Sequence, residues 1–172
     1  MNGDGFEIGG YYPGSIGHVV EAHAVYYSEY WGFDVSFESQ VAREMGDFFA
    51  RFDSKISGFW TIREKARFVG SVAIDGENSL KEGARLRWFI VQPEFQGKSS
   101  GKYLLKTAIE FCSQVGHNKI FLWTFRGLES ARSLYERAGF QLVLEHEVAQ
   151  WGNVIVEQKF ELQLPNTEQE RF

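Results

Sequence analysis

The sequence predicts a mixed α/β fold in which about four helices flank a mostly antiparallel sheet. Helical and strand-like patterns alternate along its 172 residues in the order α, α, β, β, β, α, β, α, β, β. One helix separates two strand-like segments, and such a crossover requires a parallel or splayed pair of strands inside the sheet. An apolar share of 44% supplies enough material for a packed interior. We expect a single domain, residues 1–172, with loose ends at 1–10 and 165–172.

Two helices are predicted first, at Ser15–Tyr30 and Glu38–Phe52, because their apolar residues recur at helical spacing. Ser15 follows a proline and a glycine, so we expect it to be the N-cap of the first helix. Three strand-like runs come next, joined by short polar loops that suit an antiparallel meander. These runs are Phe59–Arg63, Arg67–Ile74 and Arg85–Val91.

The second half begins with a long predicted helix that starts after Gly97 and ends near Gly116. Its remaining elements are a short buried strand, a helix stopped by Gly139 at its C′ position, and two final strands. Gly152 and Asn153 stand between those strands and indicate a tight turn. The expected ranges are Ile120–Thr124, Ser130–Ala138, Gln141–Trp151 and Asn153–Leu164.

Composition excludes several classes of protein. The net charge of −5 argues against broad nucleic-acid binding. Cys112 is the single cysteine and has no intrachain partner for a disulfide, which favours a reducing compartment. The polar start of the chain lacks the apolar core of a signal peptide, and no apolar run approaches the roughly 18 residues that span a bilayer. We therefore expect a cytoplasmic protein that binds neither nucleic acid nor membrane, and no metal site.

The most informative segment runs from Phe89 to Lys102, where a strand ends and a helix begins among small residues. Free N–H groups at a helix start carry the positive end of its dipole, and small residues let a phosphate approach the backbone. Lys98 and Lys102 add positive charge. This pattern indicates a pyrophosphate site, although a plain glycine-rich turn has the same spacing.

A nucleotide-triphosphatase P-loop is a second alternative for this segment, because Gly97-Lys98-Ser99 matches the end of that motif. Gln92 stands where the motif requires its first glycine, and Pro93 lies inside the would-be loop. Both observations disfavour the P-loop.

The hexapeptide Gln96-Gly97-Lys98-Ser99-Ser100-Gly101 resembles the acetyl-coenzyme A motif of the GNAT superfamily of acetyltransferases, with Ser99 in place of the usual glycine. A second stretch, Ala131 to Phe140, is similar to the family's Ala-x-x-Leu-Tyr-x-x-x-Gly-Phe helix. Leu128 stands where that family often has asparagine. The first helix also looks like a bacterial GNAT subgroup that is found fused to MarR-type regulators.

This resemblance implies a GNAT-like central sheet of six to seven strands, splayed in the middle, and acetyl-coenzyme A as the cofactor. It also implies that the cofactor lies against backbone donors of the splayed strand and the following helix, and against the later helix. The implied cofactor-binding residues are Phe89, Ile90, Val91, Gln96, Gly97, Lys98, Ser99, Ser100, Gly101, Lys102, Ala131 and Leu134.

The resemblance makes Tyr135 the candidate general acid, since a tyrosine hydroxyl carries a proton at neutral pH. A core tyrosine is the alternative. Some family members carry a basic glutamate where this chain has Arg85, which cannot accept a proton. The general base is left open among Glu82, His23 and Glu29.

Helix 15–30 and its end are expected to border the acceptor site through His23, Tyr26, Tyr27 and Trp31, with core packing as the alternative. Arg85 and Arg87 alternate with apolar residues and should share one sheet face. There they bind an acidic group of the acceptor or form ion pairs.

The implied activity is N-acetylation of a primary amine of a small molecule or protein. The alternative is a non-catalytic acyl-coenzyme A binder on the same fold. The family resemblance also favours a homodimer.

Overall fold

The computed structural model describes residues 5–165, and these form a seven-stranded sheet with the strand order β1-β2-β3-β4-β5-β7-β6. Neighbouring strands are antiparallel except β4 and β5, which are parallel. This confirms the predicted mixed, mostly antiparallel sheet. The strands are β1 Phe6–Gly9, β2 Gly58–Glu64, β3 Arg67–Asp75, β4 Ala84–Val91, β5 Lys119–Phe125, β6 Gln141–Gln150 and β7 Asn153–Gln163.

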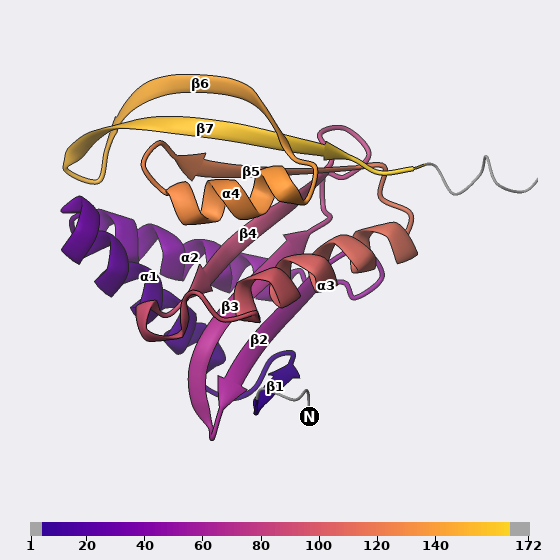
Figure 1. Ribbon diagram of the computed structural model, residues 1–172, viewed down its shortest axis with the longest axis horizontal. Coiled ribbons are helices and arrows are strands. Elements are labelled where there is room, and N and C mark those ends of the chain that lie inside the picture. Colours follow the sequence, from indigo (N-terminus) through magenta and orange to yellow (C-terminus); the bar gives the residue numbers. More distant parts are fainter. Residues whose placement is uncertain (1–4, 166–172) are drawn as a thin grey trace, which may run out of the picture.

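Helices cover both faces of the sheet (Figure 1). On one face α3 and α4 enclose a core that includes Leu104, Ala108 and Tyr135. On the other face α1 and α2 enclose a core that includes Val19 and Phe48. The helices are α1 Ser15–Trp31, α2 Val35–Ala50, α3 Ser100–Gln114 and α4 Glu129–Arg137, and a 3-10 turn spans Pro93–Phe95. No helix of the described part is long and apolar enough to cross a membrane.

The helix α2 shows how the sequence determines this packing. Its buried residues Phe37, Val41, Met45 and Phe48 recur every three to four positions and therefore lie on the side that faces the sheet. Asp34 is the N-cap, and its carboxylate accepts a hydrogen bond of 2.9 Å from the Ser36 amide. A capped start and an apolar stripe together fix the position of α2 over the sheet.

The first strand was not predicted. Phe6–Gly9 pairs with β2, with Phe6 opposite Glu64, so the expectation of a loose end over residues 1–10 is wrong for these four residues. Three of the four are exposed, and a short edge strand of this kind carries no alternating pattern. The expected loose end at 165–172 lies, beyond Pro165, outside the described residues.

Two turn predictions are corrected and one is confirmed. Gly14, with φ +96°, is the N-cap of α1, and Ser15 is its first helical residue. The β6–β7 turn is Trp151-Gly152, one residue earlier than expected, and both residues have positive φ as a type I′ turn requires. Gly139 has φ +96° directly after the C-cap of α4, as predicted.

The strands β4 and β5 separate soon after they meet. They pair only at Ala84 with Ile120 and at Arg85 with Phe121, and from Leu86 onward this edge of β4 has no strand beside it. The predicted splay in the middle of the sheet is therefore present.

A β-bulge lies in β4 just beyond this point. Three steps along β4, from Arg87 to Ile90, match two steps along β3, from Ala73 to Ser71. Trp88 sits at the bulge with φ +47°, and the Ser71 hydroxyl donates a 2.8 Å hydrogen bond to its carbonyl. Simple alternation would place Trp88 on the same face as Leu86, but the bulge turns Trp88 toward α1 and α2.

Candidate active site

A cavity of about 1110 Å³ opens where β4 and β5 separate, and α1, α2, α3 and α4 all contribute to its walls. All but two of the site residues that we predicted from the sequence line this cavity. Those that line it are His23, Tyr26, Tyr27, Arg85, Arg87, Phe89, Ile90, Val91, Gln96, Gly97, Lys98, Ser100, Gly101, Lys102, Ala131, Leu134 and Tyr135. Ser99 and Trp31 do not line it; Trp31 packs instead against Tyr27, Phe33 and Phe125.

The start of α3 presents a run of free backbone donors to this cavity. Among residues 5–165, the amides from Gly97 to Lys102 have no hydrogen-bond acceptor, while the next amide, Tyr103, bonds to the Ser99 carbonyl at 2.9 Å. Gly97 has φ +76°, which favours glycine, whereas Ser99 has φ −68°, which any residue adopts. Serine at position 99 is therefore compatible with this backbone.

Close packing holds this loop against the splayed strand. A Cβ atom on Gly101 would lie 3.4 Å from a methyl group of Leu134 and 3.6 Å from Phe89 and from Val91. The Gln96 side chain donates a 3.0 Å hydrogen bond to the Val91 carbonyl. Free amides, a positive helix end and little side-chain bulk are the features that a pyrophosphate requires. The residues present therefore fit coenzyme A.

Tyr135 is buried between Phe89, Phe140 and Phe160, with ring centroids 5.7, 5.9 and 6.2 Å away. Its hydroxyl has no hydrogen-bond partner in the described part of the chain, where no fully enclosed polar side-chain atom is left unpaired. The hydroxyl is therefore open to the cavity. Burial raises the pKa of Tyr135 well above its ordinary value, so that it keeps its proton throughout the physiological range.

Of the three candidates for the general base, only His23 lines the cavity, whereas Glu29 and Glu82 are exposed elsewhere. The His23 Nδ1 lies 2.8 Å from the Val19 carbonyl and donates to it, which leaves Nε2 without a proton. Burial lowers the pKa of His23 to about 4, although the bond to Val19 opposes this. His23 is thus neutral at pH 7, with a free acceptor nitrogen.

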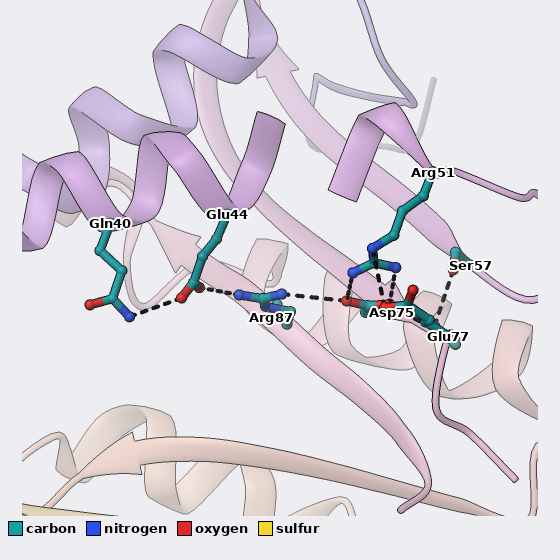
Figure 2. A network of polar contacts seen from close by, with 8 residues as sticks. Gln40, Glu44, Arg51, Ser57, Asp75, Glu77 and Arg87 are labelled. Atoms are coloured by element: carbon teal, nitrogen blue, oxygen red, sulfur yellow. Dashed lines mark hydrogen bonds and ion pairs between the residues drawn. The ribbon is translucent and has the colours of Figure 1, made fainter. Parts of the chain in front are cut away.

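A network of ion pairs and hydrogen bonds lies between α2 and the face of the sheet that α2 covers (Figure 2). Arg87 pairs with Glu44 of α2 and, at 3.4 Å, with Asp75 at the end of β3. Arg51 donates two hydrogen bonds to Asp75, at 2.9 and 2.7 Å. Burial alone would raise the pKa of Asp75, but the Arg51 hydrogen bond and the charges of Arg51 and Arg87 hold it below its ordinary value.

This network continues through two more side-chain hydrogen bonds to the opposite edge of the cavity. Gln40 donates to Glu44 at 2.9 Å, and the Trp151 indole donates to the Gln40 oxygen at 2.9 Å. The turn between β6 and β7 is thereby connected to α2. Both carboxylates that Arg87 contacts, Glu44 and Asp75, also receive hydrogen bonds from other residues.

Arg85 differs from Arg87 although the two share a face of β4. Its guanidinium has no carboxylate within 4.0 Å and no hydrogen-bond partner among residues 5–165, yet it lines the cavity and is partly buried. Burial lowers the pKa of Arg85, and the nearby charge of Arg87 lowers it further. The negative charges of Glu44, Asp75 and Glu157 act in the opposite direction. Within the described part of the chain, Arg85 is therefore a cation of the β4 wall with no paired carboxylate, whereas Lys98 and Lys102, which also have none, line the cavity at the start of α3.

Several lining residues were not predicted, and they come from elements far apart in the sequence. They include Phe37, Gln40, Val41 and Glu44 of α2, Trp123 and Phe125 of β5, and Glu157 of β7. Each of these residues fits the apolar or charged pattern that its own helix or strand would have without any functional site. Only the register of β5 with β7 and the position of α2 bring them together, so no local signal in the sequence identifies them.

Comparison with known proteins gives a consistent result. A sequence profile of the acetyltransferase (GNAT) family matches residues 21–140. An uncharacterized N-acetyltransferase of Methanocaldococcus jannaschii is 28% identical over 123 residues, which make up 68% of this chain and 54% of that protein. The chain thus spans about half the length of this curated relative.

Solved structures share the fold. The Salmonella typhimurium protein yncA, whose structure contains its cofactor acetyl-CoA, has a TM-score of 0.68 and 16% identity, covering 94% of this chain and 95% of that one. An acetyltransferase of the GNAT family from Staphylococcus aureus Mu50 has a TM-score of 0.72 and 16% identity, covering 93% and 99%. Identities this low establish a common architecture.

Proposed function

Because this chain belongs to the GNAT family of acetyltransferases, we propose that it is an N-acetyltransferase that acts on a primary amine of a small molecule or protein. Acetyl-coenzyme A, the cofactor of this family, supplies the acetyl group as an activated thioester. The observation that carries the proposal is the row of free amides from Gly97 to Lys102 beside the open edge of β4.

These two sets of backbone groups suit the two ends of the cofactor. The amides at the start of α3, with Lys98 and Lys102, would hold the pyrophosphate. The edge of β4 from Leu86 to Val91 would hydrogen-bond the pantetheine arm as a missing strand would. Leu128, the N-cap of α4, lines the cavity without a side-chain cap bond and offers the arm an apolar contact.

Two side chains are suited to moving protons at the reaction centre. The Tyr135 hydroxyl faces the cavity and would donate to the departing sulfur, because its raised pKa keeps the proton in place. The free Nε2 of His23 would accept a hydrogen bond from the neutral amine and then take the proton that the amine loses as its nitrogen bonds to the acyl carbon.

Thiol release in the presence of acetyl-coenzyme A and a panel of amines tests this proposal. We expect thermal stabilisation by the cofactor and turnover of at least one amine class. Stabilisation without any turnover would instead indicate a non-catalytic acyl-coenzyme A binder. A protein that saturating acetyl-coenzyme A fails to stabilise would contradict both functions.

A further inference from the structure

We infer that Arg85 is the recognition site for a carboxylate on the acceptor, so that the substrate class is a carboxylate-bearing primary amine with an apolar body. This inference rests on the proposed function and assigns the acceptor side of the same cavity.

The position of Arg85 is the first argument. It is the last residue of β4 that pairs with β5, and it stands at the point where the slot between the two strands begins. Its side chain lies on the α2 face, opposite Ala84 and Leu86, which point into the α3 and α4 core. A ligand on the α2 face could therefore contact Arg85 while its amine reaches into the slot.

The charges around Arg85 are the second argument. The neighbouring Arg87 is already neutralised by Glu44 and Asp75, and its guanidinium also stacks over the Trp88 ring at 4.3 Å. Two further carboxylates line the cavity: Glu157 accepts a hydrogen bond from His146 at 3.1 Å, and Glu129 lies in the first turn of α4. The Arg85 guanidinium is thus partly desolvated and has no carboxylate within 4.0 Å among the described residues, and a ligand carboxylate would supply the missing pair.

The walls beside Arg85 are the third argument. Trp123 and Phe125 of β5, Phe37 of α2 and Trp151 of the β6–β7 turn all line the cavity. These rings offer apolar area and no cation, so they suit the uncharged side chain of an acceptor that also carries an amine and a carboxylate. Apolar and aromatic amino acids combine these features.

Matched acceptor pairs test the inference. L-phenylalanine and L-methionine would be compared with L-phenylalaninamide and L-methioninamide, which lack the carboxylate, in the wild type and in Arg85→Gln. We expect the ratio of kcat/KM for acid over amide to fall about 10- to 100-fold in Arg85→Gln, the usual effect of losing a charge-assisted pair. The ratio should fall less in Arg85→Lys, because lysine keeps the positive charge although it lacks the bidentate hydrogen-bonding geometry of a guanidinium.

Two controls separate recognition from a structural effect. Arg43→Gln removes an exposed arginine of α2 that does not line the cavity and should leave the ratio unchanged. Stabilisation by coenzyme A should persist in Arg85→Gln, which shows that the variant folds. If Arg85→Gln loses acid and amide turnover equally, or if the wild type does not prefer the acid, the inference is wrong.

A binding experiment keeps this inference separate from the proposed function. With coenzyme A present, 3-phenylpropionate should bind the wild type about 10-fold or more tightly than Arg85→Gln, and 3-phenylpropionamide should not discriminate. If the protein shows this binding preference but acetylates no amine, the proposed acetyltransferase activity is rejected and the carboxylate-binding role of Arg85 is retained. Equal binding of 3-phenylpropionate to both proteins would reject the site.

Discussion

Gly97 and Ser99 lie two residues apart in the loop before α3, yet their backbones have opposite signs of φ, +76° and −68°. Only the first of these values favours glycine. Apart from residue 97 and its two chain neighbours, no atom of the described residues lies within 4 Å of the place where a Cβ of residue 97 would be, so any cost of a side chain there comes from the backbone conformation.

Gly97→Ala should therefore weaken coenzyme A binding, because a non-glycine residue in this region costs roughly 1–2 kcal/mol and the loop would relax away from its binding geometry. Ser99→Gly is the matched change and should leave affinity nearly unchanged, since residue 99 needs no positive φ. Calorimetric titration with coenzyme A measures both. Equal losses in the two variants would contradict this account of the loop.

Tyr135→Phe should lower kcat by about 100-fold or more, as expected when a general acid is removed. Coenzyme A affinity should not change, because the ring still packs against Phe89, Phe140 and Phe160. Since burial raises the Tyr135 pKa, no loss of wild-type activity with rising pH should trace to this residue below about pH 10. An unchanged kcat would remove Tyr135 from the mechanism.

Asp75→Asn should destabilise the fold by about 3 kcal/mol at pH 7, because it leaves Arg51 and Arg87 without their shared carboxylate. The folded-state pKa of Asp75 is depressed, so its contribution is present above the unfolded pKa and lost as pH falls through the folded value. The difference between wild type and variant should therefore shrink in acid, as urea unfolding at pH 7 and pH 3 would measure.

Glu77→Gln is the control for this network. Glu77 also pairs with Arg51, at 3.2 Å, but its side chain is 54% exposed. Such a surface pair contributes about 0–1 kcal/mol, so its loss should be small. If Glu77→Gln loses as much stability as Asp75→Asn, the stabilisation does not come from the burial of the Asp75 ion pairs.

His23 should make the fold less stable in weak acid. Its pKa is about 4 in the folded chain against 6.5 for the ordinary group, so between these values the unfolded chain binds a proton that the folded chain does not. The unfolding free energy should fall by up to about 3 kcal/mol from pH 6.5 to pH 4 on this account. In His23→Phe this fall should be smaller, whereas in His18→Gln, which changes an exposed histidine, it should persist.

Cys112 should not react with a chromogenic disulfide in the folded protein. It is fully buried on α3, and burial raises its pKa to about 12, so almost no thiolate forms at pH 8. Denaturant should expose the one thiol per chain. Rapid reaction of the folded protein would show that α3 opens far more readily than its packing indicates, and would also complicate any assay of thiol release.

The sequence predicts the parts of this fold that depend on local pattern. Helices such as α2 and α3 follow from periodic apolar residues, and Gly139 marks the end of α4 because one conformation there favours glycine. The two motifs around Gly97 and Tyr135 lie at α3 and α4, which one strand, β5, separates in the sequence, and the family resemblance led us to expect that both would meet one cavity.

Other features depend on contacts that no local pattern records. The bulge at Trp88 needs Ser71 of β3 to satisfy its carbonyl, and Glu44 reaches Arg87 only because α2 lies over β4. Aromatic residues are equally ambiguous from sequence. Tyr27 lines the cavity, while Trp31, one turn later on the same helix, packs against Phe125 and does not line it.

The bulge in β4 has an effect beyond its own hydrogen bonds. Without the extra residue, Arg85, Phe89 and Val91 would project from the same side of the strand. With it, Arg85 points toward α2 while Phe89 and Val91 pack toward α3 and α4. One strand thereby presents a different chemical surface at each end. On the function proposed above, variation at Arg85 would change the acceptor side and leave the side chains of Phe89 and Val91 as they are.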